Sequence, residues 1–313
     1  MAVYVVGDFL RETRLRKGYT QEEVSYGICT PASLSRIENG MQKPGRLILE
    51  KLFERLGTEN NLFNSFVSKE EMELYLEIQT LIRNVTDGDL HRIEEQIDIV
   101  EKLTQNASEL ERQSLFWAKG TLAAQKYGNN EKAIEWLMRA IQITLPDFDG
   151  KNPLRNHLLT FDEITIINSI AVRHGEKGEL LTAIQLDMWL KEYMENKIVD
   201  GKMKTAKYPM ILYNLSYWLG DENCHNEALK MAEQGVDYCV KYGNLPALPT
   251  LIFNKGAALA ELGRSDEAKK CFFQSITIFE AMKKPTQVQI AIDWCREHYQ
   301  MEIQYPPSIG PNA

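Results

Sequence analysis

The sequence predicts an all-α protein in which a small bundle of short helices precedes a longer array of paired helices. Residues 7–57 hold four amphipathic stretches separated by breaks that contain Gly or Pro, which is typical of short helices joined by tight turns. After Asn60, helical patterns continue with only short breaks until a Pro-rich end. We therefore expect an N-terminal domain over residues 1–66, a repeat domain over residues 67–305 and a disordered tail over residues 306–313.

The first two helices are marked by apolar faces and by their ends. Residues 7–17 place Phe9, Leu10 and Leu15 on one helical face, and a Gly follows as a stop. Thr20 opens the segment Thr-Gln-Glu-Glu, a capping box in which Glu23 stands three residues later. A short break at residues 27–29 then separates the second helix from the third.

The third and fourth helices complete the N-terminal domain. Residues 31–39 are expected to be helical, because Thr30 and Pro31 are typical of a helix start and Gly40 of a helix end. A Lys-Pro-Gly break precedes a fourth amphipathic helix over residues 46–56. Four short helices with a tight turn between the second and the third form the layout of a helix-turn-helix domain.

The third helix would be the recognition helix, which sends side chains to base edges. Leu34 and Ile37 are apolar and three residues apart, so they are expected to face the core. The outward positions are Thr30, Ala32, Ser33 and Arg36. Arg36 is the strongest candidate for base readout, because its guanidinium group matches O6 and N7 of guanine. A phosphate contact or a salt bridge is the alternative for Arg36.

Three motifs resemble the lambda-repressor/XRE helix-turn-helix family over about residues 7–57: T-Q-E-E-V at 20–24, S-R-I-E-N-G at 35–40 and K-P-G at 43–45. The resemblance implies that Gln21 clamps a phosphate and that Glu38 has a structural role. Lys43, Arg46 and Arg14 could also meet phosphates. A solvated surface position is an equal alternative for each of these three.

A register of small residues predicts the repeats. Ala171 stands twelve positions before Ala183, Ser216 before Ala228 and Gly256 before Ala268, while Gly120 stands thirteen before Ala133. Small residues at paired positions let two helices approach closely, and the pattern resembles the tetratricopeptide repeat. Residues 71–103 are expected to form a leading helix pair, and residues 286–304 a capping helix.

The first helix of each repeat would line a concave face. Asn side chains on that face could hydrogen-bond the backbone of an extended peptide, and aromatic side chains could hold its apolar groups. The candidates for peptide binding are Asn168, Tyr213, Asn214, Tyr217, Phe253 and Asn254. The alternative for the Asn residues is that they tie neighbouring helices together.

Composition narrows the classes of function. Residues 1–66 hold nine Lys and Arg against eight Asp and Glu, a net charge of +1, so the rest of the chain carries −9 and the whole chain −8. DNA binding through the first domain is therefore permitted. The five Cys are not spaced as zinc ligands, and we expect no metal, no cofactor and no catalytic residues. No apolar run approaches the length of a membrane span, and the apolar N-terminus is interpreted as the start of a helix. We expect a cytoplasmic protein.

The combination of an XRE-type domain with tetratricopeptide-like repeats resembles the RRNPP class of peptide-pheromone receptors. The resemblance implies a homodimeric transcription regulator that binds a double-stranded DNA operator and is controlled by a short signalling peptide, as in quorum sensing. One alternative is a regulator whose repeats bind a protein partner. Two others are an adaptor with a degenerate helix-turn-helix and a phosphatase, for which no residues can be assigned.

Overall fold

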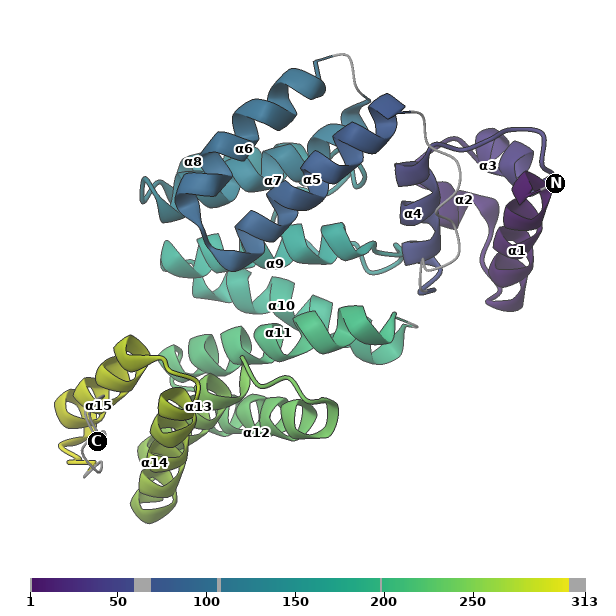
Figure 1. Cartoon of the computed structure of the whole chain (residues 1–313). Coiled ribbons are helices and arrows are strands. Elements are labelled where there is room, and N and C mark those ends of the chain that lie inside the picture. The colour runs from purple at the N-terminus through teal and green to yellow at the C-terminus, as the bar shows by residue number, and fades with distance from the viewer. Residues whose placement is uncertain (1, 59–68, 106–107, 198, 304–313) are drawn as a thin grey trace. The chain divides into compact units, whose positions relative to one another are not determined.

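The computed structural model describes residues 2–58, 69–105, 108–197 and 199–303. These residues form fifteen helices and no strand, which confirms the all-α prediction (Figure 1). The predicted disordered tail at residues 306–313 lies outside the described residues. The chain divides into two compact units, Met1–Met203 and Lys204–Ala313.

The first unit begins with the predicted four-helix bundle. Its helices are α1 (Ala2–Arg16), α2 (Gln21–Ser25), α3 (Pro31–Glu38) and α4 (Arg46–Arg55). Their shared core contains Leu10, Val24, Leu34, Ile37, Leu52 and Phe53. The capping box between Thr20 and Glu23 is present at the start of α2, and Thr30 caps α3.

The predicted apolar face of the first helix was wrong at one position. Leu10 is buried and Phe9 packs against the core, but Leu15 is 58% exposed. The buried face continues instead through Thr13 and Arg14, three and four residues after Leu10. Arg14 can be buried on this face because its guanidinium group donates to the carboxylate of Glu38.

Three helix pairs follow in the first unit and lie in successive layers (Figure 1). The helices are α5 (Lys69–Asp87), α6 (Leu90–Leu103), α7 (Glu109–Gln125), α8 (Asn130–Ile141), α9 (Phe161–Glu176) and α10 (Leu180–Asn196). The pair α5–α6 matches the predicted leading pair. Ala171 and Ala183 are fully buried where α9 packs on α10, as the register of small residues predicts.

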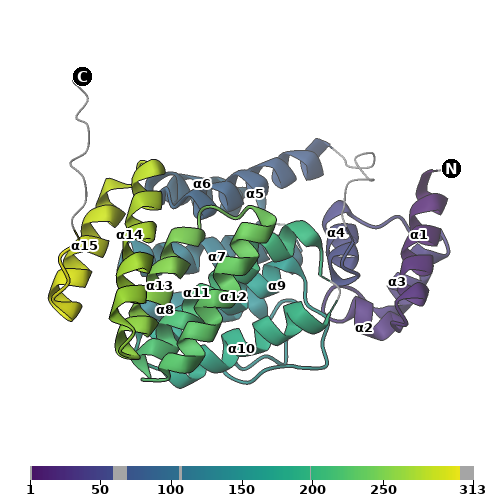
Figure 2. The ribbon, with the colours of Figure 1, turned by 90° about the horizontal axis from the view of Figure 1, so that it is seen from below.

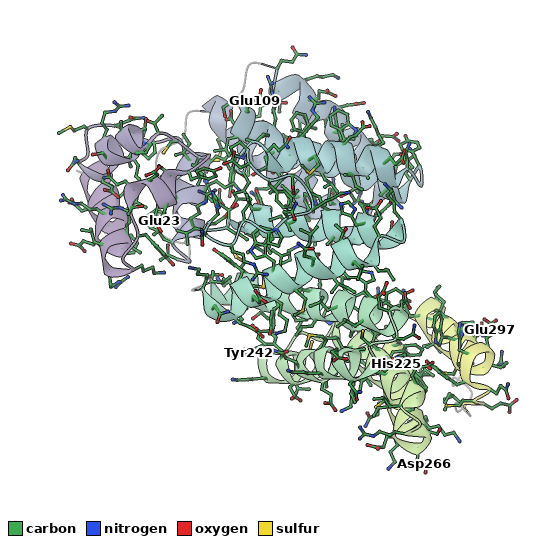
Figure 3. The ribbon with its side chains drawn as sticks, turned by 180° about the vertical axis from the view of Figure 1, so that it is seen from behind. Glu23, Glu109, His225, Tyr242, Asp266 and Glu297 are labelled. Atoms are coloured by element: carbon green, nitrogen blue, oxygen red, sulfur yellow. The ribbon has the colours of Figure 1, made fainter. Side chains whose placement is uncertain are left out.

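The second unit is also built from helices (Figure 2). Helix α11 (Gly201–Asp221) begins just before the division and lies mostly in this unit. It is followed by α12 (His225–Tyr242), α13 (Leu248–Glu261), α14 (Ser265–Ala281) and the predicted capping helix, α15 (Pro285–Tyr299). His225 and Tyr242 mark the two ends of α12, and Asp266 lies in the first turn of α14 (Figure 3). Helices α12 to α15 pack in chain order. Within the described part of the chain, no helix is both long and apolar enough to cross a membrane.

The register of small residues makes a prediction about stability in the second unit. A Cβ atom on Gly256 would lie 2.8 Å from the ring of the fully buried Phe272. We expect Gly256→Ala to lower the free energy of unfolding by about 1–3 kcal/mol, because a close-packed ring must shift. The measurement is urea denaturation followed by circular dichroism.

Gly220→Ala is the matched control, because a Cβ atom at that helical position meets nothing within 4 Å. Its helix propensity favours a small gain of up to about 1 kcal/mol. Equal effects of the two substitutions would contradict the packing role of the register.

Candidate functional site

The outer face of α3 is arranged as a DNA-reading surface would be. Thr30, Ala32 and Arg36 are exposed, and Ser33 is half-buried. Arg36 Nη2 donates to Ser33 Oγ over 3.1 Å, and its Nε donates to Gln42 Oε1 over 3.0 Å. The four outward positions therefore gather on one face, with the guanidinium group of Arg36 held beside Ser33.

A buried ion pair fixes the orientation of α3. Arg14 on α1 contacts Glu38 at the end of α3 through two bonds, of 2.6 Å and 2.9 Å. Gln21 Nε2 on α2 donates to the same carboxylate over 2.7 Å, and Arg14 also donates to the carbonyl of Tyr19 over 2.9 Å. The hydrogen bond to Glu38 raises the pKa of Arg14. One carboxylate thus joins three helices, in keeping with the structural role expected of Glu38, and Arg14 is buried rather than on the surface.

The two remaining DNA candidates lie in different surroundings. Lys43 is exposed in the loop between α3 and α4. Arg46, at the first position of α4, is half-buried, and its guanidinium carbon lies 3.8 Å from the centroid of the Tyr75 ring on α5. Arg46 therefore faces the repeat helices, where a cation over an aromatic ring is stabilising.

The inner side of α4 holds two buried cations that the sequence reasoning missed. Arg55 Nη2 lies 2.7 Å from Glu163 Oε1 on α9, and neither side chain is exposed. Lys51 forms an ion pair with Asp162 on the same helix. No local signal marked either cation, because both stand at charged positions of an amphipathic helix that also carries Glu50 and Glu54.

The helix-turn-helix turn adds a second contact with the repeats. Gly27 has a positive φ of 66°, and a Cβ atom on it would lie 2.0 Å from the carbonyl oxygen of Thr144. Only Gly fits this close approach. Beside it, the Tyr26 hydroxyl donates to Asp147, and the Tyr26 ring lies 4.5 Å from that of His157.

We define the docking surface as the region where Arg46, Lys51 and Arg55 of α4 contact Tyr75 of α5 and Asp162 and Glu163 of α9. The charged groups at this surface alter one another's pKa values. Burial opposes the charged form of Lys51, but Asp162 and Glu54 outweigh that cost and raise the pKa of Lys51. The pKa of Glu54 is raised to about 7, mainly by burial; Lys51 opposes the shift and Asp162 adds to it. Glu54 also accepts a hydrogen bond from the backbone N–H of Phe161 over 3.1 Å. The contact between α4 and α9 therefore contains a carboxyl group whose burial holds its pKa above the ordinary value.

Two of the three candidate Asn residues tie helices together in this structure. Asn168 on α9 donates to both carboxylate oxygens of the buried Asp187 on α10, each over 3.1 Å. In the second unit, Asn254 on α13 donates to Ser216 Oγ over 2.8 Å and to the carbonyl of Tyr213 over 3.3 Å. Asn214 is also buried. The arrangement fits the helix-tying alternative for Asn168 and Asn254.

The aromatic candidates of the second unit lie near two cavities. Tyr213 lines one of about 360 Å³ and Phe253 lines another of about 420 Å³. Pro246 and Thr250 line both, so the two cavities adjoin. Tyr217 on α11 is 44% exposed but is not among the residues that line either cavity.

Comparison with known families identifies both parts of the chain. A family model described as the RNPP family C-terminal domain matches residues 82–299. A helix-turn-helix model matches residues 10–59. The uncharacterized HTH-type transcriptional regulator YqaF of Bacillus subtilis (strain 168) is 38% identical over 63 residues, which cover 20% of this chain and 83% of YqaF.

Solved structures share the fold. PlcR of Bacillus thuringiensis, in complex with the peptide PapR7 and DNA, has a TM-score of 0.62 at 17% identity, and the match covers 92% of this chain and 99% of that one. The apo form of PlcR has a TM-score of 0.57 at 17% identity, over 93% of this chain and 98% of that one. At such low identity the likeness concerns the fold alone.

The raised pKa of Glu54 predicts a pH dependence of stability. Between pH 4.5 and about 7 the folded chain holds a proton on Glu54 that the unfolded chain has released. The contribution of Glu54 to the free energy of unfolding therefore falls as the pH rises through this window. We expect Glu54→Gln to reduce the loss of stability between about pH 5 and about pH 8 by about 1–3 kcal/mol. Urea denaturation across this range measures it.

Glu297→Gln is the control, because Glu297 is exposed on α15 (Figure 3). This variant should lose as much stability over the pH range as the unmodified chain. If the Glu54→Gln variant does the same, Glu54 does not titrate as the docking surface requires.

Proposed function

The chain belongs to the RNPP family, and we propose that a short peptide bound by its repeats controls its binding to a double-stranded DNA operator. Both family matches support a helix-turn-helix transcription regulator. The observation that supports DNA binding is the exposed face of α3, which is held in place by the buried contact between Arg14 and Glu38. The peptide and the DNA bound to PlcR support the choice of ligands.

On this proposal the DNA-binding roles are divided along the first domain. Arg36 reads a guanine edge in the major groove, and Thr30, Ala32 and Ser33 lie against the neighbouring bases. Lys43 contacts a phosphate, and so does Gln21 at the N-terminus of α2. The Gln21 amide donates one N–H to Glu38 and has a second N–H for the phosphate. We assign Arg46 to the docking surface, because its guanidinium group already covers Tyr75.

A homodimer would present two copies of α3, one from each protomer, to the two half-sites of an operator. Half-sites would then be spaced by about 34 Å or a multiple of it, one turn of the double helix. A cytoplasmic protein of this kind needs no cofactor for the proposed activity.

The peptide would act through the contact between α4 and α9. Asp162 and Glu163 occupy the first turn of α9 and hold Lys51 and Arg55 of the DNA-binding bundle. Asn168 lies further along the same helix. A ligand that binds more tightly to one position of α9 than to another shifts the bundle by that difference in affinity and by no more.

The proposed DNA-binding roles predict the effects of two substitutions. We expect Arg36→Ala to weaken binding to the selected operator by about 10- to 100-fold, the equivalent of about 1–3 kcal/mol, and to relax the base preference at one position. Lys43→Ala should weaken all sequences alike and reduce the salt dependence of binding. The measurement is selection from a random DNA library, followed by titration at fixed salt.

Arg264→Ala, at the start of α14 in the second unit, is the control and should bind DNA as the unmodified chain does. Circular dichroism verifies that each variant is folded. Unchanged affinity and base preference in a folded Arg36→Ala variant would remove the direct-readout role and favour an adaptor.

The proposed binding of a peptide is tested by native mass spectrometry of the chain, purified from its own host at high cell density. We expect a dimer that carries an adduct whose fragments define a short peptide. An unliganded dimer that spent medium leaves unchanged would instead favour a regulator controlled by a protein partner.

A further inference from the structure

The two adjoining cavities of the second unit form an open, mostly apolar groove, which we name the C-terminal groove. Its larger compartment, of about 420 Å³, lies among α13, α14 and α15. Its smaller compartment, of about 360 Å³, lies between α11 and the start of α13. Each falls within the usual size range of ligand pockets, about 300–1,000 Å³.

Apolar side chains dominate the larger compartment. Its apolar walls include Phe253, Phe279, Met282, Ile290 and Trp294. Ile290 is 60% exposed, and Met210 in the smaller compartment is 47% exposed. Covering such side chains removes apolar surface from water, which favours an apolar ligand.

Charge in the groove is confined to one place. Lys284 is the single charged side chain among the described residues that line the two compartments. It directly precedes α15, whose N-terminal end carries the positive pole of the helix dipole. An anionic group is therefore favoured at this end of the groove, and no carboxylate among the lining residues opposes it.

The shape of the groove favours a peptide over a single alkyl chain. Two compartments that meet at Pro246 and Thr250 suit separate side chains on one backbone. Polar groups for that backbone are available at Thr250 and Gln287, which line the larger compartment. Asn244 holds the wall of the smaller one, since it donates to the carbonyl of Thr205 over 2.7 Å and accepts from the backbone N–H of Ala247 over 3.3 Å.

We propose that the C-terminal groove binds the C-terminal end of a short apolar peptide, with large side chains in the two compartments and the terminal carboxylate at Lys284. This inference rests on the proposed function, in which the repeats bind a signalling peptide. It assigns the chemical class of that peptide and the direction in which it lies. It also assigns no peptide contact to Asn168 or Asn254, because their amide groups are hydrogen-bonded to other helices.

The test uses the full chain and a hexapeptide library in which one position at a time is fixed, prepared with free and with amidated C-termini. Bound peptides are identified by mass spectrometry, and the best is titrated by calorimetry. We expect at least two large aliphatic or aromatic positions, and an affinity at least about tenfold lower for the amide than for the free acid. Lys284→Gln should abolish that difference, whereas Lys283→Gln should keep it.

Two further variants test the apolar walls without disturbing the core. Ile290→Asp and Met210→Asp alter exposed side chains, so the fold should survive, and each should lower the affinity at least about tenfold. Val240→Asp on α12, at a position 70% exposed and outside the groove, is the matched control and should have no effect.

The outcomes separate the groove from the proposed function. A selected peptide that binds all these variants equally would contradict binding in the C-terminal groove, but it would leave the proposed control by a peptide unaffected. A chain that binds its operator but selects no peptide overturns both the groove and the peptide half of the proposed function. Binding of oleate in place of every peptide would show that the groove takes a lipid and would also overturn the proposal.

Discussion

The guanidinium group of Arg55 and the carboxylate of Glu163 meet at 2.7 Å with neither side chain exposed. Each charge has lost its water, so the pair is stable only while both partners remain in place. These residues lie 108 positions apart, on the last helix of the DNA-binding bundle and the first turn of α9. This contact helps to set the position of α3 relative to α9, because α4 shares one apolar core with α3.

The same helix, α9, carries a second buried polar contact within the first unit. Asp162 and Glu163 hold α4, and Asn168 on the same helix is bonded to the buried Asp187 of α10. Helix α9 is thus held by charged groups in its first turn and by a buried amide further along. A buried ion pair cannot stretch gradually, since partial separation leaves two desolvated charges without compensation. The ion pair between Arg55 and Glu163 therefore favours a few discrete positions of α4 relative to α9 over a continuous range.

Local rules made the first domain predictable. Thr20 with Glu23, and Thr30 with Pro31, mark helix starts by chemistry that operates within one turn, and the outward face of α3 follows from the positions of Leu34 and Ile37. The small residues of the repeats were predictable for the same reason, because close helix packing requires them at a fixed spacing. Periodicity failed at Leu15, where the polar pair of Arg14 with Glu38 redirects the buried face.

Partners distant in sequence could not be predicted. Lys51 and Arg55 stand among the charged positions of an amphipathic helix, a pattern that is typical of a solvent-exposed face and does not indicate Asp162 and Glu163 as partners. The role of the Asn residues could not be predicted either. Their spacing indicated a face of the repeats, but that spacing is the same whether an amide binds a ligand or a neighbouring helix.

Asn254 shows what that ambiguity means for recognition in the second unit. Its amide donates to Ser216 and to the backbone of Tyr213, so a ligand that bonded it would first have to break these contacts between α13 and α11. Breaking a hydrogen bond to make another gains little, because the donor is satisfied in both states. The exposed apolar side chains of Ile290 and Met210 carry no such cost, since a ligand replaces only water. Affinity in this unit is therefore gained most readily from apolar contact, and polar groups serve to orient what is bound.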